Sequence, residues 1–191
     1  MKEVAVFKKV SKAQFGETYR NMYPTFDFTA KIMDDMYESI RIPKRATAGS
    51  AGYDFVTPFP FVLYPGTKIW IPTGIRVEMK DSSYALLLVP RSKFAKHSIR
   101  IANTIGVVDG DYYYADNEGH IIIVLEMSDC SKSPDVKSCF GNLTKNVTEP
   151  VVFHAGDRIG QGIFVEFGIC FGDSNREDIP KRAGGFGSTG K

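Results

Sequence analysis

The stretch TKIWIPTGIRVEM, residues 67–79, shows the β character of this 191-residue chain most plainly. It contains two runs rich in β-branched residues, and the break between them, Pro72-Thr73-Gly74, is typical of a tight connection between strands. Further segments of this kind follow, separated by clusters of Gly, Pro, Asp and Asn; they cover residues 83–90, 98–108, 120–128, 150–154 and 158–171. Many short strands without strand–helix alternation predict an all-β barrel or sandwich.

The first 40 residues have a different pattern, which predicts a short mixed α/β extension. Residues 4–7 favour a strand, residues 11–20 favour a helix with Ser11 as its N-cap, and residues 28–37 carry apolar side chains at helical spacing. Residues 128–150 are polar and lack periodicity, which indicates a long surface excursion. We therefore predict an extension over residues 1–40, a barrel over 41–180 and a glycine-rich arm over 181–191.

Composition narrows the classes of protein to which the chain can belong. A hydrophobic fraction of 43% and a charged fraction of 24% are ordinary for one soluble globular domain. The formal net charge of +2 argues against bulk nucleic-acid binding, and the longest pure apolar run, residues 121–125, is far shorter than a membrane span. Three cysteines without a C-x-x-C pair favour reduced thiols over a disulfide framework or a zinc site. These features, with no signal peptide at the N-terminus, predict a cytoplasmic protein with no nucleic-acid or membrane partner.

Five short stretches are richer in Gly, Asp, Arg and Ser than strand ends require. In order they are ATAGSAGYDF (46–55), VPRSKFA (89–95), ANTIGVVDGDYY (102–113), HAGDRIGQ (154–161) and KRAGGFGSTG (181–190). Each is a modest signal alone, but together, in this order, they resemble the five motifs of the trimeric deoxyuridine triphosphatase (dUTPase) family. The resemblance extends over residues 42–190.

The resemblance implies a distorted jelly-roll-like β-barrel of the dUTPase type. It also implies hydrolysis of dUTP to dUMP and pyrophosphate with Mg²⁺, in a homotrimer whose active sites are shared between subunits. Such a reaction needs a positioned water, a base and cations along the phosphates.

Asp109 is the candidate general base. An isolated Asp-Gly is more often a turn that bonds its own backbone, but this Asp matches the residue that orients the attacking water in the family. By the same resemblance, Tyr112 would lie under the deoxyribose. Asn103 would read the uracil edge together with backbone groups of Gly106, Val107 and Val108.

The phosphate and metal contacts implied by the resemblance come from three other motifs. Arg91 and Ser92 offer a cation and a hydroxyl to phosphate oxygens, and Lys93 either adds a contact or points to solvent. Gln161 resembles the glutamine near phosphate and magnesium, and Asp54 would approach Mg²⁺ through water. The adjacent Arg158 is either a phosphate ligand or an ion-pair partner of Asp54, and we favour the ion pair.

The arm that ends the chain would close over the nucleotide in a dUTPase. Phe186 would stack on uracil, while Gly187, Ser188 and one cation would meet the phosphates. Lys181-Arg182-Ala183 departs from the family's usual Arg-Gly-x, so either Lys181 or Arg182 serves; we favour Arg182 for its bidentate fork. YYYADNEGH, residues 112–120, is a longer turn than the family's Tyr-Arg-Gly.

Two other functions compete with this hypothesis. A dCTP deaminase shares the barrel, although the GGFGSTG arm argues against it. A regulatory protein on the same scaffold would bind a protein partner through residues 1–40 or 128–150.

The arm yields the first testable prediction. Deleting residues 181–191 should leave the melting temperature nearly unchanged, because a glycine-rich tail buries little apolar area, yet dUTP turnover should collapse. Phe186→Ala should be milder, losing a stack worth about 1–3 kcal/mol. Arg182→Ala and Lys181→Ala, assayed in parallel, identify the cation. An idle tail would leave all four variants at the parental rate.

Overall fold

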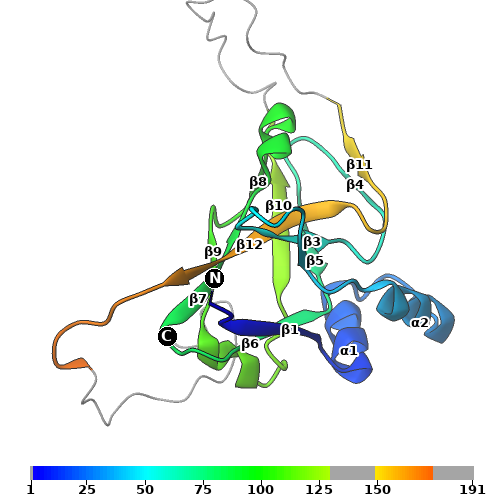
Figure 1. The fold of residues 1–191 in the computed structure, drawn as a ribbon. Coiled ribbons are helices and arrows are strands. Elements are labelled where there is room, and N and C mark those ends of the chain that lie inside the picture. The colour runs from blue at the N-terminus through cyan, green and yellow to red at the C-terminus, as the bar shows by residue number, and fades with distance from the viewer. Residues whose placement is uncertain (1, 130–148, 174–191) are drawn as a thin grey trace, which may run out of the picture.

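The computed structural model describes residues 2–129 and 149–173 (Figure 1). Its strands are β1 (Ala5–Lys9), β2 (Lys44–Arg45), β3 (Tyr53–Val56), β4 (Phe61–Leu63), β5 (Lys68–Pro72), β6 (Ile75–Met79), β7 (Tyr84–Val89), β8 (Ile99–Ile101), β9 (Gly106–Val108), β10 (Ile122–Met127), β11 (Val151–Phe153) and β12 (Arg158–Glu166). Its helices are α1 (Lys12–Met22), α2 (Ala30–Ser39) and the short 3-10 helices η1 (Ser92–His97) and η2 (Gly110–Tyr114).

The strands assemble into four ladders. The largest has the order β2-β3-β12-β7-β9, with β12 at its centre and β9 at one edge. The others are β5-β10-β8, β1-β6 and β11-β4, and every recorded pair is antiparallel. In Figure 1 β12 crosses the body of the molecule, and α1 and α2 lie together at one side. The described part of the chain is thus mostly strand, as the sequence predicts.

A single apolar core joins the ladders to the N-terminal extension. Its fully buried side chains come from several ladders and from α1; the largest are Phe15, Tyr19, Phe55, Leu63, Ile71, Ile75, Leu86, Ile121, Ile123, Leu125, Met127 and Ile159. Burying each such side chain contributes about 1.5–3 kcal/mol relative to exposure. The boundary at residue 40 remains a prediction, because residues on its two sides share this core.

The N-terminal elements form where the sequence predicts them. Ser11 is extended (φ −62°, ψ 153°), and its hydroxyl accepts a hydrogen bond from the Gln14 amide, which is the usual role of an N-cap serine. The second helix begins two residues later than predicted, after the N-cap Thr29. The strand β1 pairs with β6, so the extension also completes a ladder of the β body.

The Pro72-Thr73-Gly74 break connects two strands that do not pair with each other. The strand β5 pairs with β10, whereas β6 pairs with β1. Gly74 has φ +72°, and a Cβ there would lie 2.3 Å from Ile40 Cδ1. The predicted tight connection between two strands is confirmed, and glycine lets the chain turn there from one ladder into another.

None of the helices in the described residues is long and apolar enough to span a membrane.

His120 is an ionisable side chain buried near this turn, with 0% of its surface exposed. The Gly74 amide donates to its Nε2 (2.8 Å), and its Nδ1 lies 3.1 Å from the Thr18 hydroxyl. Desolvation lowers the pKa of His120 to about 4, against an opposing effect of Glu118. The imidazole is therefore neutral in the folded protein near pH 7.

Stability should fall as the pH drops from about 6.5 towards 4, because in that window the unfolded chain binds a proton at position 120 that the folded protein does not. Urea unfolding at pH 7 and pH 5 should show a loss of about 2 kcal/mol from this group. His120→Asn should be less stable at pH 7 but depend less on pH, while His154→Asn, at an exposed position, should keep the wild-type dependence. An unchanged slope in His120→Asn would contradict the assignment.

Candidate functional site

Asp54 lies between two arginines. Its Oδ1 is 3.2 Å from Arg91 Nε, and its Oδ2 is 3.3 Å from Arg158 Nε. The Asp54 side chain is 16% exposed, so both ion pairs form where solvent screening is reduced. The predicted ion pair between Arg158 and Asp54 is confirmed, and Arg91 shares the same carboxylate.

Strand register brings these residues together from distant parts of the chain. Gln161 in β12 lies directly opposite Asp54 in β3 and opposite Val89 in β7. Opposed residues of an antiparallel pair project to the same face, so Asp54 and Gln161 share a face. Arg91 follows two residues after Val89 and is still extended (φ −83°, ψ 146°).

The backbone at Gly52 passes closely over Gln161. A Cβ at position 52 would lie 2.4 Å from Gln161 Oε1, so only glycine fits without a shift of that amide. The Gln161 Nε2 donates to the Pro90 carbonyl at 3.3 Å. The glycine of the AGYD sequence therefore allows the side chain of Gln161 to pack beside Asp54.

This arrangement suits a magnesium ion held largely by phosphates and water. Both oxygens of Asp54 face guanidinium groups, and the described residues contain no group of three or more His, Cys, Asp or Glu able to hold a metal. Magnesium keeps several waters and takes few protein ligands in nucleotide sites. A water-mediated role for Asp54 and Gln161 fits this geometry.

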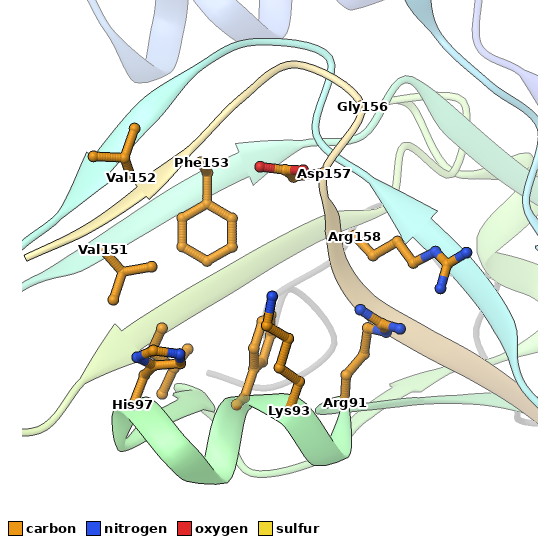
Figure 2. Close-up of a pocket in the computed structure, with 11 residues that line it drawn as sticks. Arg91, Lys93, His97, Val151, Val152, Phe153, Gly156, Asp157 and Arg158 are labelled. Atoms are coloured by element: carbon orange, nitrogen blue, oxygen red, sulfur yellow. The ribbon is translucent and has the colours of Figure 1, made fainter.

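A pocket of about 270 Å³ opens beside the Asp54 ion pairs (Figure 2). Its basic side chains are Arg91, Lys93, His97 and Arg158, and Figure 2 shows Lys93 reaching from η1 into the space below β11. Its other lining residues are Phe94, Ile99, Val151, Val152, Phe153, Gly156 and Asp157. Lys93 lines this pocket while remaining exposed to solvent, so its contact with phosphate stays a prediction.

Residues 103–108, which are predicted to bind the uracil base, lie at the edge of the five-stranded sheet. Asn103 is exposed in the turn before β9, where Thr104 has φ +65°. The strand β9 consists of Gly106, Val107 and Val108. It is the last strand in the order of the five-stranded sheet, where its neighbour is β7. The opposite side of β9 is thus an edge whose amides and carbonyls can meet a ligand.

Asp109 and Tyr112 follow β9 at the two ends of one helical turn. Asp109 is exposed and extended (φ −79°, ψ 159°) before η2. Tyr112 is buried at 7% exposure, and its hydroxyl donates to the His120 carbonyl (2.9 Å) and accepts from Asn117 Nδ2 (2.8 Å). Its contact with deoxyribose stays a prediction, and any such contact involves the small accessible part of the ring.

Two groups of site residues lie apart within one copy of the chain. Gln161 is level with Val89 of β7, whereas Val108 is level with Leu86. Asp109 is therefore displaced from Gln161 by about 13 Å along the strands and about 10 Å across two strand spacings. Asp54, Arg91 and Gln161 form one group, and Asp109 belongs to the other.

The remaining predicted residues lie outside the described part of the chain. These are Arg182, Phe186, Gly187 and Ser188, together with the alternative cation Lys181. Ser92 is described, and it is exposed as the first residue of η1.

The sequence analysis missed the contacts of the turn at residues 115–120. Glu118 accepts from the Ser11 amide (2.8 Å) and hydroxyl (2.6 Å), and His120 meets Thr18. The only sequence signal was the unusual length of the turn after Tyr112, which does not identify its partners. These contacts bridge more than 100 positions in the chain.

Comparison with known proteins identifies the family. Residues 38–132 match the dUTPase family. A Lactococcus lactis protein named deoxyuridine 5'-triphosphate nucleotidohydrolase is 36% identical over 152 residues, covering 79% of this chain and 89% of its own length. A protein of the same name from Shewanella pealeana is 33% identical over 169 residues, covering 84% of this chain and 94% of its own.

Comparison with solved structures agrees with these matches. The crystal structure of a dUTPase from Streptococcus mutans superimposes with a TM-score of 0.56 at 28% identity, covering 87% of this chain and 98% of that one. The fold expected from the sequence, an all-β barrel of the dUTPase type, is thereby confirmed. This chain belongs to the dUTPase family.

Proposed function

We propose that this protein is a dUTP diphosphatase, which hydrolyses dUTP to dUMP and pyrophosphate. The observation that carries the proposal is the β3–β12 register, which sets Asp54 beside Gln161 and within reach of Arg91 in a member of the dUTPase family. This arrangement offers cationic and amide groups on one face, as a triphosphate requires.

The phosphate chain is held by the group around Asp54. Arg91 and Ser92 contact phosphate oxygens at the start of η1, and Lys93 adds a second cation from the same turn. Asp54 and Gln161 would hold Mg²⁺ through water, and the ion would supply positive charge to the phosphates. Arg158 orients the Asp54 carboxylate through its ion pair.

Asp109 supplies the base for the chemical step. Its carboxylate takes a proton from a water molecule while the water oxygen forms a bond to the α-phosphorus. The bond from that phosphorus to the bridging oxygen breaks, and the electron pair leaves with pyrophosphate. The exposed position of Asp109 at the end of β9 lets it approach a substrate from outside its own subunit.

The nucleoside is selected along β9 and η2. Asn103 and the outer backbone edge of Gly106 to Val108 bond the uracil ring, and close packing near its C5 excludes the methyl group of thymine. Tyr112 lies under the deoxyribose and disfavours a 2′-hydroxyl. The arm completes the site: Phe186 stacks on the base, and Arg182, Gly187 and Ser188 meet the phosphates.

The separation of the two groups supports a homotrimer with shared sites. A base about 16 Å from the metal-binding face cannot act on an α-phosphate held there within one copy. Beyond β12, Phe167, Ile169 and Phe171 are 48%, 63% and 110% exposed, and Figure 1 shows this segment leading away from the strand body. This non-strand segment after β12 offers an apolar surface for a neighbouring subunit.

One set of assays distinguishes the proposed reaction from its alternatives. Pyrophosphate release should occur with dUTP and be at least about 100-fold slower with dCTP, dTTP and UTP. Ammonia release from dCTP would indicate the deaminase instead. Lack of turnover with all four nucleotides would overturn the proposal and favour a regulatory protein that binds a partner through residues 1–40 or 128–150.

Replacing the base tests its assignment. Asp109→Asn should keep the fold and nucleotide binding while lowering kcat by about 10²–10⁴, the usual contribution of a positioned base. Asp111→Asn, an exposed carboxylate on the adjacent turn, is the matched control and should retain most of the activity. Near wild-type turnover in Asp109→Asn would remove Asp109 from the mechanism.

Shared sites predict complementation between variants. Coexpressed Asp109→Asn and Arg91→Ala subunits should form mixed trimers in which about one quarter of the sites combine an intact Asp109 with an intact Arg91 from its neighbour. Activity should then far exceed that of either variant alone.

Coexpressed Arg91→Ala and Gln161→Ala subunits provide the control, because both residues belong to one group and no mixed site is intact. Equal activity in the two mixtures, or a fully active monomer in sedimentation at micromolar concentration, would contradict shared sites.

A further inference from the structure

We propose that helix α1 of the N-terminal extension is a positioning element for the Asp109–Tyr112 turn. The proposal rests on the proposed function, in which these two residues act on the substrate. Ser11 and Thr18 of the extension hold Glu118 and His120, and the turn that contains them holds Tyr112.

The turn at residues 115–120 packs against Tyr112 and is hydrogen-bonded to its hydroxyl. The Tyr112 hydroxyl donates to the His120 carbonyl (2.9 Å) and accepts from Asn117 Nδ2 (2.8 Å), while Asn117 Oδ1 accepts from the Gly119 amide (3.2 Å). Gly119 has φ +66°, and a Cβ there would lie 2.5 Å from the Tyr112 carbonyl oxygen. The backbone of residues 117–120 therefore packs directly against Tyr112.

Glu118 is hydrogen-bonded to the start of α1. Ser11 donates from its amide (2.8 Å to Oε2) and from its hydroxyl (2.6 Å to Oε1), and Arg76 Nη1 lies 3.4 Å from Oε2. Burial opposes ionisation of Glu118, but the Ser11 hydrogen bonds and Arg76 outweigh it and lower the pKa of the carboxyl. The carboxylate also lies at the positive end of the helix dipole.

Glu118 accepts the hydrogen bond from the N-cap amide that, in a capping box, a residue of the helix itself accepts. In a capping box the third helical residue, here Gln14, returns a side-chain acceptor to the N-cap amide. Gln14 Nε2 instead donates to the Thr18 hydroxyl (3.1 Å), and the Ser11 amide bonds to Glu118, 107 positions away. The capping of α1 is therefore coupled to the shape of the turn.

His120 and Thr18 form a buried hydrogen bond. Because the Gly74 amide donates to Nε2 (2.8 Å), the neutral ring carries its proton on Nδ1 and donates it to the Thr18 hydroxyl (3.1 Å). That hydroxyl in turn donates to the Gln14 carbonyl (2.9 Å). Both ring nitrogens of His120 are therefore hydrogen-bonded, and its carbonyl accepts from the Tyr112 hydroxyl.

Two adjacent buried residues of α1, Thr18 and Tyr19, allow the effect on the turn to be measured apart from a general loss of stability. Thr18 bonds towards the turn, whereas the Tyr19 hydroxyl donates to the Pro72 carbonyl of β5 (2.8 Å). Thr18→Val removes a buried hydroxyl that contacts the His120 ring, the Gln14 side-chain amide and the Gln14 carbonyl. Tyr19→Phe removes one that donates to the Pro72 carbonyl. Each variant leaves buried polar groups without that partner, so both should unfold at lower temperature than the wild type.

The experiment measures hydrogen exchange of the amides in residues 110–120 together with steady-state kinetics. Relative to Tyr19→Phe, Thr18→Val should raise exchange in this segment about tenfold, lower kcat for dUTP about tenfold and reduce the preference for dUTP over UTP, because a small misplacement of reacting groups is costly. Thr18→Ser keeps the hydroxyl and should restore wild-type values. If Thr18→Val fails to fold, Glu118→Ala replaces it, with Asp34→Asn as control in the exposed Lys12–Asp34 ion pair.

Equal exchange and equal kinetics in Thr18→Val and Tyr19→Phe would overturn the proposal, and so would raised exchange with unchanged kinetics. Exchange does not depend on any substrate, so it still reports whether α1 holds the turn if the wild-type protein fails to hydrolyse dUTP. That failure would count against the proposed function alone.

Discussion

The pairing of β12 with two neighbours at once is the constraint on which the candidate site depends. β3 and β7 flank this strand, so residue 161 is level with residue 54 on one side and residue 89 on the other. A shift by one residue would turn Gln161 to the opposite face and remove it from Asp54. Glycine at position 162 leaves room for this pairing, since a Cβ there would lie 2.8 Å from Leu86 Cδ1.

The same ladder explains why one copy of the chain holds two separated groups of site residues. β9 joins the sheet on the far side of β7. Its register sets Val108 level with Leu86, so Asp109 lies towards the opposite end of β7 from Val89, the residue level with Gln161. A symmetric oligomer can bring the Asp109 group of one subunit to the Asp54 group of another, because a rotation axis repeats both groups on every subunit. The segment after β12 exposes Phe167, Ile169 and Phe171, and the proposed assembly would cover these apolar side chains.

Local signals in the sequence predicted most of the elements but few of their partners. Ser11 was identifiable as an N-cap because capping depends on residues three positions apart, and the ion pair between Asp54 and Arg158 followed from the family motifs. Partner choice for β5 and β6 depends on packing around Gly74 and Ile40, which no short window contains. The bonds of Glu118 and His120 to α1 were missed for the same reason, since they join residues more than 100 positions apart.

Electrostatics at Asp54 limit how this face can hold a metal. Two guanidinium groups occupy the carboxylate, and direct coordination of Mg²⁺ would require at least one ion pair to break at a site that is only 16% exposed. Breaking a partly buried ion pair leaves a charge with less solvent to compensate it, which is costly. A water-bridged ion avoids that loss, because the phosphates supply the inner ligands and Asp54 needs only to orient a bound water. Arg91 pairs with Asp54 through Nε, and in the proposed reaction its remaining donors would bind the phosphates.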